Sequence, residues 1–414
     1  MGWARRAVLA ASAAWGTRQA MAQGQAQGQA QPPGSPLAVG AIFPLSGPLA
    51  PLGDESFRGV EMAVAARNAA GGIAGRALRL ARADAQDEAG AVAEARRLIA
   101  AERVAALFGS VVSTVALPAS QVAELGGIPF FELGAKADAL LERGQRLVFR
   151  ASPSAEDFAA TSLTALTTLI APAFGAPAHA MRIGILHEDA PGGQSVARAQ
   201  ARLIAAAGLT VVEPIAQGAP GFGAALARLR GEQVDILLHT GQPGEELLLF
   251  RAFREASWRP RMLIGTAGGY GLAETARAIG DSFLGAMSVD LTPFAVDEAH
   301  APGASGFAEA YLRRYGMPPR SGHGLAAFVG AGLCLEAMSR AGGLDAPRIR
   351  AAVLALDQPE GTTGTGWGAR FDERGQNQRA RPVICQWQAG PGGPRQVALL
   401  GSPGGMAPLV PRLG

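Results

Sequence analysis

The sequence of 414 residues contains only two cysteines, Cys334 and Cys385, and a single lysine, Lys136. Two cysteines cannot build a disulfide framework, and because both lie in apolar runs we interpret them as buried free thiols. No run of about 18 apolar residues is present to span a bilayer, which excludes a membrane-embedded protein. The five histidines are scattered without metal-ligand spacing, so we expect no metal and no cofactor.

The sequence also lacks an excess of charge of one sign. It has 37 bases and 34 acids, but three of the arginines lie in the first 22 residues, which contain no acid. Without that segment the balance is 37 − 3 = 34 bases against 34 acids. The sequence has no stripe of basic residues that would bind nucleic acid, so we expect no nucleic-acid partner.

Motifs of catalysis are missing as well. No glycine-rich loop ends in Lys-Ser or Lys-Thr, as phosphate-binding loops do. Ser195 follows Gly193 but lacks the second glycine of a nucleophile elbow. Without a nucleophile, a base and a residue to orient the base, we expect a binding protein rather than an enzyme.

The N-terminus has the features of an export signal. Arg5 and Arg6 precede a modest apolar stretch, and Ala20-Met21-Ala22 is a small-residue cleavage site. We therefore predict a signal peptide over residues 1–22, cleavage near Ala22/Gln23 and a periplasmic mature protein, with the general secretory and twin-arginine routes both open. Residues 23–36 (QGQAQGQAQPPGSP) form a low-complexity linker, and the Pro- and Gly-rich residues 401–414 are expected to form a flexible tail.

Between these ends, short apolar runs alternate with amphipathic stretches. The first runs, such as LAVGAIF and VAALF, predict buried strands, and the stretches that follow have apolar residues at helical spacing. The same alternation restarts after residue 154, with MRIGILH and VDILLH as strands. The length exceeds what one hydrophobic core usually serves, so we expect two α/β modules with mainly parallel sheets.

From Leu37 to about Ala389 the chain resembles the branched-chain-amino-acid type of periplasmic solute-binding protein, which serves ATP-binding-cassette (ABC) importers. The resemblance rests on a collinear series of motifs: IFPLSGPLAPLGDESFRGVEMAVAARNAAGGIAGRALRL, ALFGSVVSTVALPAS, GIPFF, RLVFRASPS, RIGILHED and FDERG. It implies the type I periplasmic-binding-protein fold, an α/β fold of two doubly wound parallel-sheet lobes joined by three hinge crossovers. Lobe 1 would comprise residues 37–153 plus 290–367, and lobe 2 residues 154–289 plus 368–400, with crossovers near 152–154, 289–292 and 366–371.

The candidate binding residues begin at a helix start. The loop that precedes Ser113 and Thr114 opens a helix, whose free N–H groups suit a carboxylate, although a plain helix cap would use the same residue types. In the resemblance, Ser113 takes the position of the carboxylate-binding serine, and the next ligand loop falls on Gly134, Ala135 and Lys136. Other ligand positions of the family fall on Gly192, Gln242, Ala267, His323 and Leu52.

Several of these positions depart from the family pattern. Ala267 stands where the family has the acidic residue that pairs with an α-ammonium, and burying an ammonium without a carboxylate costs about 3 kcal/mol or more. A cation at Lys136 with the hydroxyls of Ser113 and Thr114 favours an anion without an ammonium: a keto acid, an aromatic acid or a dicarboxylate. The alternative is a solvated Lys136 at the cleft rim, neutralised by Asp138.

The resemblance implies a non-catalytic extracytoplasmic receptor that closes on a small amino acid or other carboxylate and delivers it to an ABC permease. We expect a monomer whose partners are this ligand and the membrane permease. The alternative function is a ligand sensor of the same fold that signals to a membrane or regulatory partner. The identity of the ligand does not follow from the sequence, because the residues of the ammonium anchor are not matched.

Overall fold

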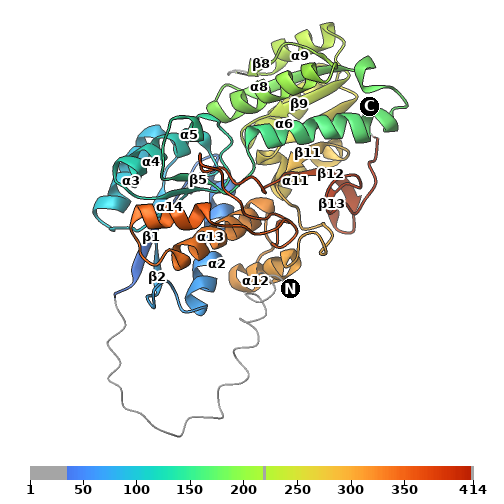
Figure 1. The fold of residues 1–414 in the computed structure, drawn as a ribbon. Coiled ribbons are helices and arrows are strands. Elements are labelled where there is room, and N and C mark those ends of the chain that lie inside the picture. The colour runs from blue at the N-terminus through green and yellow to red at the C-terminus, as the bar shows by residue number, and fades with distance from the viewer. Residues whose placement is uncertain (1–34, 218–220, 412–414) are drawn as a thin grey trace, which may run out of the picture.

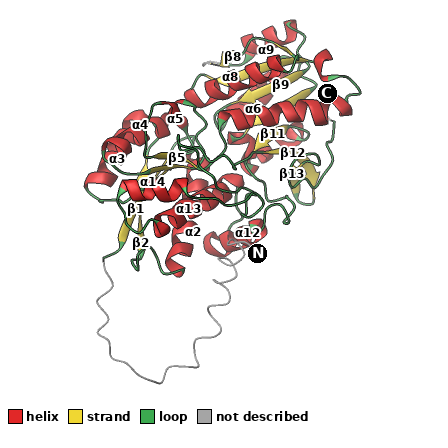
Figure 2. Cartoon of the chain, viewed as in Figure 1, coloured by secondary structure: helices red, strands yellow, loops and turns green. Residues whose placement is uncertain are grey.

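The computed structural model of the protein describes residues 35–217 and 221–411. The predicted signal peptide and all but the last two residues of the predicted linker lie outside these ranges. Two separate β-sheets occupy two ends of the molecule (Figure 1), and helices cover the strands of each (Figure 2). The alternation of strands and helices in the sequence therefore builds two α/β lobes.

The first sheet has the strand order β2-β1-β3-β4-β5, and every pair of neighbours is parallel. All seven residues of its second strand in space, LAVGAIF, are buried, because helices cover both faces of a parallel sheet. The carboxyl ends of the strands meet along one edge, where the loops can form a site. The strands are β1 (Leu37–Phe43), β2 (Leu78–Asp84), β3 (Leu107–Gly109), β4 (Phe130–Glu132) and β5 (Val148–Arg150).

Helices from two distant parts of the chain surround the first sheet. Helix α13 packs closely on α2, because Gly59 has no side chain: a Cβ there would lie 2.1 Å from the carbonyl oxygen of Gly324. The returning segment thus belongs to the first lobe. The helices are α2 (Ala50–Ala69), α3 (Glu88–Ala100), α4 (Ser113–Leu125), α5 (Ala139–Glu142), α12 (Ala304–Tyr315), α13 (Gly322–Arg340) and α14 (Ala346–Leu354).

The second sheet has the order β13-β12-β11-β10-β9-β6-β7, with β8 paired to β6. The strands from β6 to β11 are parallel, whereas β12 and β13 form an antiparallel hairpin at one edge. The strands are β6 (Arg182–Glu188), β7 (Thr210–Val211), β8 (Ile215–Gln217), β9 (Ile236–Thr240), β10 (Met262–Thr266), β11 (Met287–Asp290), β12 (Val383–Gly390) and β13 (Gly393–Ala398). The helices are α6 (Ala155–Thr164), α7 (Ala171–Ala173), α8 (Pro191–Ala206), α9 (Gly223–Gly231), α10 (Glu245–Glu255) and α11 (Ala273–Ile279).

The contacts of the FDERG motif bear on where the third of the three predicted crossovers lies. Phe371 packs edge-on against Phe149 of β5, at 6.3 Å between ring centroids, and Gln376 pairs with Arg150. The FDERG motif therefore lies on the first lobe. We propose that the third crossover lies near residue 380 rather than at 366–371, so residues 368–379 join lobe 1 in the division of the chain.

Two smaller expectations concern the cysteines and the tail. Cys334 in α13 and Cys385 in β12 are buried and free, as predicted. Residues 401–411 are tied to β12, since the Val410 N–H donates to Gln386 Oε1 (2.9 Å) and Gln386 Nε2 donates to the Val410 carbonyl (2.8 Å). This part of the predicted flexible tail is therefore anchored.

Candidate functional site

The walls of the candidate site begin at two loops of the first lobe that share one buried carboxylate. Glu132, the last residue of β4, has no solvent exposure. Its side chain accepts backbone N–H bonds from five residues at 2.7–3.1 Å: Ser110, Val111, Leu133, Gly134 and Ala135. A carboxylate with this many donors fixes both loops to each other.

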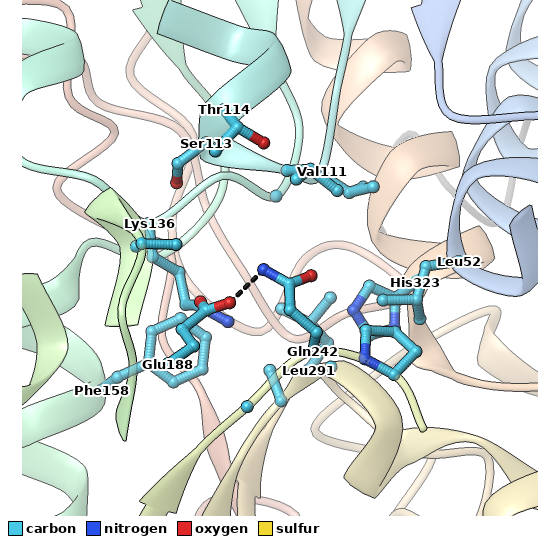
Figure 3. Close-up of a pocket in the computed structure, with 18 residues that line it drawn as sticks. Leu52, Val111, Ser113, Thr114, Lys136, Phe158, Glu188, Gln242, Leu291 and His323 are labelled. Carbon is cyan, nitrogen blue, oxygen red and sulfur yellow. Dashed lines mark hydrogen bonds between the residues drawn. The ribbon is translucent and has the colours of Figure 1, made fainter. Parts of the chain in front are cut away.

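One of these loops opens helix α4. Its N-cap, Val112, supplies no side-chain hydrogen bond, so the N–H groups of Ser113 and Thr114 at the helix start have no cap. The Ser113 hydroxyl accepts the N–H of Ala137 from the second loop (3.2 Å). Both residues line a cavity between the lobes, into which the positive end of the helix dipole points (Figure 3).

Across the cavity, helix α8 of the second lobe begins opposite α4. A Cβ on Gly192 would lie 3.0 Å from Ser113 Oγ, so this glycine allows the two helix starts to approach closely. Gly193 makes similar room on its other side, because a Cβ there would lie 2.3 Å from Cγ of Glu188. Because Gly192 and Gly193 have no side chains, the Glu188 side chain fits beside them at the cavity.

Glu188 and Gln242 form the polar wall of the second lobe. Glu188 ends strand β6 and is 7% exposed, and Gln242 follows β9 and donates its side-chain N–H to Glu188 Oε2 (Figure 3). Burial raises the pKa of Glu188, while the positive charge of Lys136 lowers it. The cavity thus contains a carboxylate that the sequence had not indicated.

Lys136 projects from the second loop toward Glu188 (Figure 3). Its Nζ lies 5.8 Å from the centre of the Phe158 ring, and within the described residues it makes no hydrogen bond and no ion pair shorter than 4.0 Å. Burial lowers the pKa of Lys136, and the negative charges of Glu188, Asp290 and Glu246 oppose that shift. An ammonium without a direct partner is available to an anionic group of a ligand.

The remaining wall is largely apolar. Leu52 and His323 come from the first lobe, and Leu291 from the segment that leaves the second sheet. Burial, together with the charge of Lys136, lowers the pKa of His323 to about 3, so this imidazole is neutral at physiological pH. The other lining residues are Val111, Val112, Phe158, Ala190, Gly241, Pro243, Ala267 and Gly268.

The structure brings together nine of the ten residues predicted for the site. These nine line the cavity: Leu52, Ser113, Thr114, Gly134, Lys136, Gly192, Gln242, Ala267 and His323. Ala135 does not, because its side chain is buried while its N–H binds Glu132. Whether these residues contact a ligand remains a prediction. The cavity has a volume of only about 40 Å³, so an organic acid requires Gln242 to move or the lobes to open.

Two interpretations of charge need revision. The rim alternative for Lys136 required Asp138 as its partner, but Asp138 lines a different cavity on the other side of the loop. The missing acidic residue at Ala267 does not leave the cavity without a carboxylate, because Glu188 supplies one from another strand. Its position at the carboxyl end of the strand in RIGILHED was the available signal in the sequence.

A buried acid behind the cavity leads to a prediction about pH. Glu246 is fully buried, its Oε1 has no hydrogen-bond partner within the described residues, and burial raises its pKa to about 8 from 4.5. Between these two values the folded state holds a proton that the unfolded state releases, so stability is lost as pH rises through this range. Glutamine has no proton to lose, so Glu246→Gln removes this pH-dependent loss. The change that Glu246→Gln makes to the free energy of unfolding should be more favourable at pH 8 than at pH 5 by on the order of 3 kcal/mol.

Urea denaturation at both pH values measures this difference. Glu255→Gln is the matched control, since the Glu255 side chain lies on the same helix, is 63% exposed and, among the described residues, pairs only with Arg251. The control should change stability equally at the two pH values. An equal effect of Glu246→Gln at pH 5 and pH 8 would show that Glu246 ionises normally in the folded state.

Two α/β lobes with a polar cavity enclosed between their strand ends form an arrangement suited to trapping a small molecule. Residues 36–390 match the sequence profile of the family described as periplasmic binding protein, and the chain belongs to this family. Within the described residues no helix is long and apolar enough to cross a membrane, and no group of three His, Cys, Asp or Glu side chains is placed to hold a metal ion.

Relatives support the same assignment. The chain is 41% identical over 364 residues to the Leu/Ile/Val-binding protein homolog 7 of Brucella suis, covering 87% of this chain and 91% of that protein. Two solved structures, each 19% identical, share its type I periplasmic-binding-protein fold. LivJ of Streptococcus pneumoniae in complex with isoleucine has a TM-score of 0.69 and covers 88% of this chain and 100% of its own. A solute-binding protein of Rhodopseudomonas palustris in complex with 4-hydroxybenzoate has a TM-score of 0.74 and covers 91% of this chain and 98% of its own.

Proposed function

We propose that the protein is an extracytoplasmic receptor that binds a small carboxylic acid between its lobes and delivers it to an ABC import permease without catalysis. The observation that carries the proposal is the cavity where the uncapped start of α4 faces Lys136, Glu188 and Gln242. Family membership and the relatives' names support the transport role. The mature protein would begin near Gln23 in the periplasm.

The charges of the cavity narrow the class of ligand. The carboxylate of the ligand would bind the N–H groups and hydroxyls of Ser113 and Thr114, with Lys136 nearby. The opposite end would meet the Glu188 carboxylate, which requires a hydrogen-bond donor or a cation. An amino acid or a hydroxylated aromatic acid satisfies both ends, whereas a dicarboxylate would bring a second negative charge against Glu188.

A screen for thermal stabilisation tests this proposal. Branched-chain and aromatic amino acids, hydroxybenzoates, keto acids and dicarboxylates would each be added to the purified protein. A true ligand at about 100 times its dissociation constant stabilises the folded state by roughly 2.7 kcal/mol. Stabilisation by dicarboxylates alone, or by no carboxylic acid, would reject the assigned class.

Closure of the lobes gives a second prediction. The lobes already touch through the Asp138 N–H, which donates to Ser195 Oγ (3.1 Å), and through Ser113 facing Gly192. A ligand that binds both walls should favour this closed arrangement over an open one. Small-angle X-ray scattering with a ligand from the screen should show a smaller radius of gyration than without it. An unchanged radius at saturation would argue against hinge closure.

The alternative, a ligand sensor, uses the same cavity and differs only in its partner. Genes for a permease and an ATPase beside this one would favour transport, and a neighbouring sensor gene would favour signalling. An enzyme is disfavoured because the cavity groups described above include no nucleophile held by a base. Turnover of a bound ligand by the purified protein would restore that possibility.

A further inference from the structure

A second cavity lies on the other side of the loop that carries Lys136. It has a volume of about 600 Å³ and is lined by residues of both lobes and of the third crossover. We call it the hinge cavity. Its polar lining is rich in arginine: Arg150 from β5, Arg198 and Arg202 from α8, and Arg374 and Arg381 from the segment before β12. In Figure 1 this segment crosses between β5 and α6.

Arg150 is a buried cation without a direct counter-ion. It is 3% exposed, and no carboxylate oxygen among the described residues lies within 4.0 Å of its guanidinium. Nε donates to Gln376 Oε1 (2.6 Å), and Nη1 donates to the carbonyl oxygens of Ala137 (3.1 Å) and Ala135 (3.4 Å). Nη2 makes no hydrogen bond within the described residues. Arg150 lines the hinge cavity, so a ligand there could become its partner. A buried charge of this kind is costly unless an anion or water completes its partners.

The other charges of the hinge cavity leave one further arginine unpaired. Arg202 pairs with Glu156, and Arg381 pairs with Asp157 (3.0 Å). Arg374 pairs with Asp372, at 3.7 Å from Nε to Oδ2. Arg198 makes no ion pair in the described residues, and its Nη2 donates only to Ser195 Oγ (3.2 Å).

Two acids also line the cavity without forming ion pairs there. Glu142 on α5 makes no ion pair within the described residues, and Asp138 accepts a hydrogen bond from Ser195. Burial raises the pKa of Asp138, and the charges of Arg150 and Arg198 lower it. Asp138 is therefore the opposing charge between the two arginines, but it lies beyond ion-pair distance of either.

We propose that the hinge cavity binds a small multivalent oxyanion between Arg150 of the first lobe and Arg198 of the second. Such a ligand would supply the counter-ion that both guanidinium groups lack and would bridge the lobes. It would also affect the candidate ligand site through Ala137. Arg150 donates to the Ala137 carbonyl oxygen, and the Ala137 N–H donates to Ser113 Oγ. Binding in the hinge cavity would thus stiffen the loop on both sides of Lys136.

Calorimetric titration with inorganic phosphate tests this proposal on the full chain, with chloride used to match ionic strength. The wild type should bind one phosphate saturably at millimolar concentration. Arg198→Gln, at an exposed position, should weaken phosphate binding about 10-fold or more, because it removes a charge-assisted contact. The matched control is Arg228→Gln on α9, whose arginine is also partly exposed and faces Glu213, and it should bind phosphate as the wild type does.

Hydrogen exchange locates the bound ion. Phosphate should slow exchange of the amides of residues 134–138 in the wild type and in Arg228→Gln, but not in Arg198→Gln. Absence of saturable binding, equal affinity in Arg198→Gln, or protection confined to other segments would each overturn the proposal. None of these measurements needs a ligand in the cavity between Ser113 and Glu188, so they stand apart from the proposed transport function.

Discussion

Glu132→Ala should destabilise the protein by about 4–6 kcal/mol and abolish ligand binding, because it leaves the backbone N–H groups of Ser110, Val111, Gly134 and Ala135 without an acceptor. The loops that carry Ser113 and Lys136 both depend on this carboxylate for their shape. Glu132→Gln keeps one acceptor oxygen and should fall between the wild type and the alanine variant. Urea denaturation measures the free energy of unfolding, and the thermal screen measures binding.

Glu124→Ala serves as the control for this prediction. Glu124 is in the same lobe and also accepts backbone N–H bonds, from Arg146 (2.9 Å) and Leu147 (2.8 Å), but it lies outside the cavity. Its loss should cost about 1–2 kcal/mol and leave ligand affinity unchanged. If Glu132→Ala were no more destabilising than Glu124→Ala and still bound ligand, Glu132 would not organise the site.

The second large effect concerns Lys136. Lys136→Ala should weaken binding of a carboxylic acid about 10- to 100-fold, equivalent to roughly 1.5–3 kcal/mol, because it deletes a charge-assisted contact with the ligand. Lys136→Arg should also weaken binding, since a broad planar guanidinium replaces a compact ammonium in a narrow cavity. Ser113→Ala should weaken binding independently, and none of these variants should unfold.

A double variant separates two roles for the lysine. If Lys136 only neutralises Glu188, then the pair Lys136→Met and Glu188→Gln should bind as tightly as Glu188→Gln alone. If Lys136 contacts the ligand carboxylate, as we predict, the double variant should bind more weakly than Glu188→Gln. Calorimetric titration with a carboxylic acid from the screen distinguishes these outcomes. Equal affinity of the double variant and Glu188→Gln, or unchanged affinity in Lys136→Ala, would contradict the assigned contact.

Much of the fold was predictable because local and global signals agree. Runs such as LAVGAIF are apolar throughout and become strands buried on both faces, and Gly59 marks the close approach of α2 and α13. The place of the third crossover is harder to predict, because FDERG contains a turn and no long apolar run. The contact of Phe371 with Phe149 and the pairing of Gln376 with Arg150 favour a place for this segment on the first lobe.

Residues of the candidate site were predictable where the path of the backbone places them. They were not predictable where their place depends on how neighbouring side chains pack. Ser113 and Lys136 lie on loops fixed by strand ends, so the collinear motifs located them. Glu188 reaches the cavity because Gly192 and Gly193 vacate the volume beside it, and that exchange is visible only in three dimensions. The separation of Lys136 from Asp138 likewise follows from the path of one loop between two cavities.

Native mass spectrometry of the protein purified from the periplasm tests the central claim most directly, the binding of one small carboxylic acid between the lobes. We expect a single small molecule bound per chain, released on unfolding, which carries a carboxylate and a second hydrogen-bond donor and is retained poorly by Lys136→Ala. A wild-type protein without any bound molecule that also responds to no carboxylic acid in the thermal screen would contradict the account. So would a ligand that lacks a carboxylate.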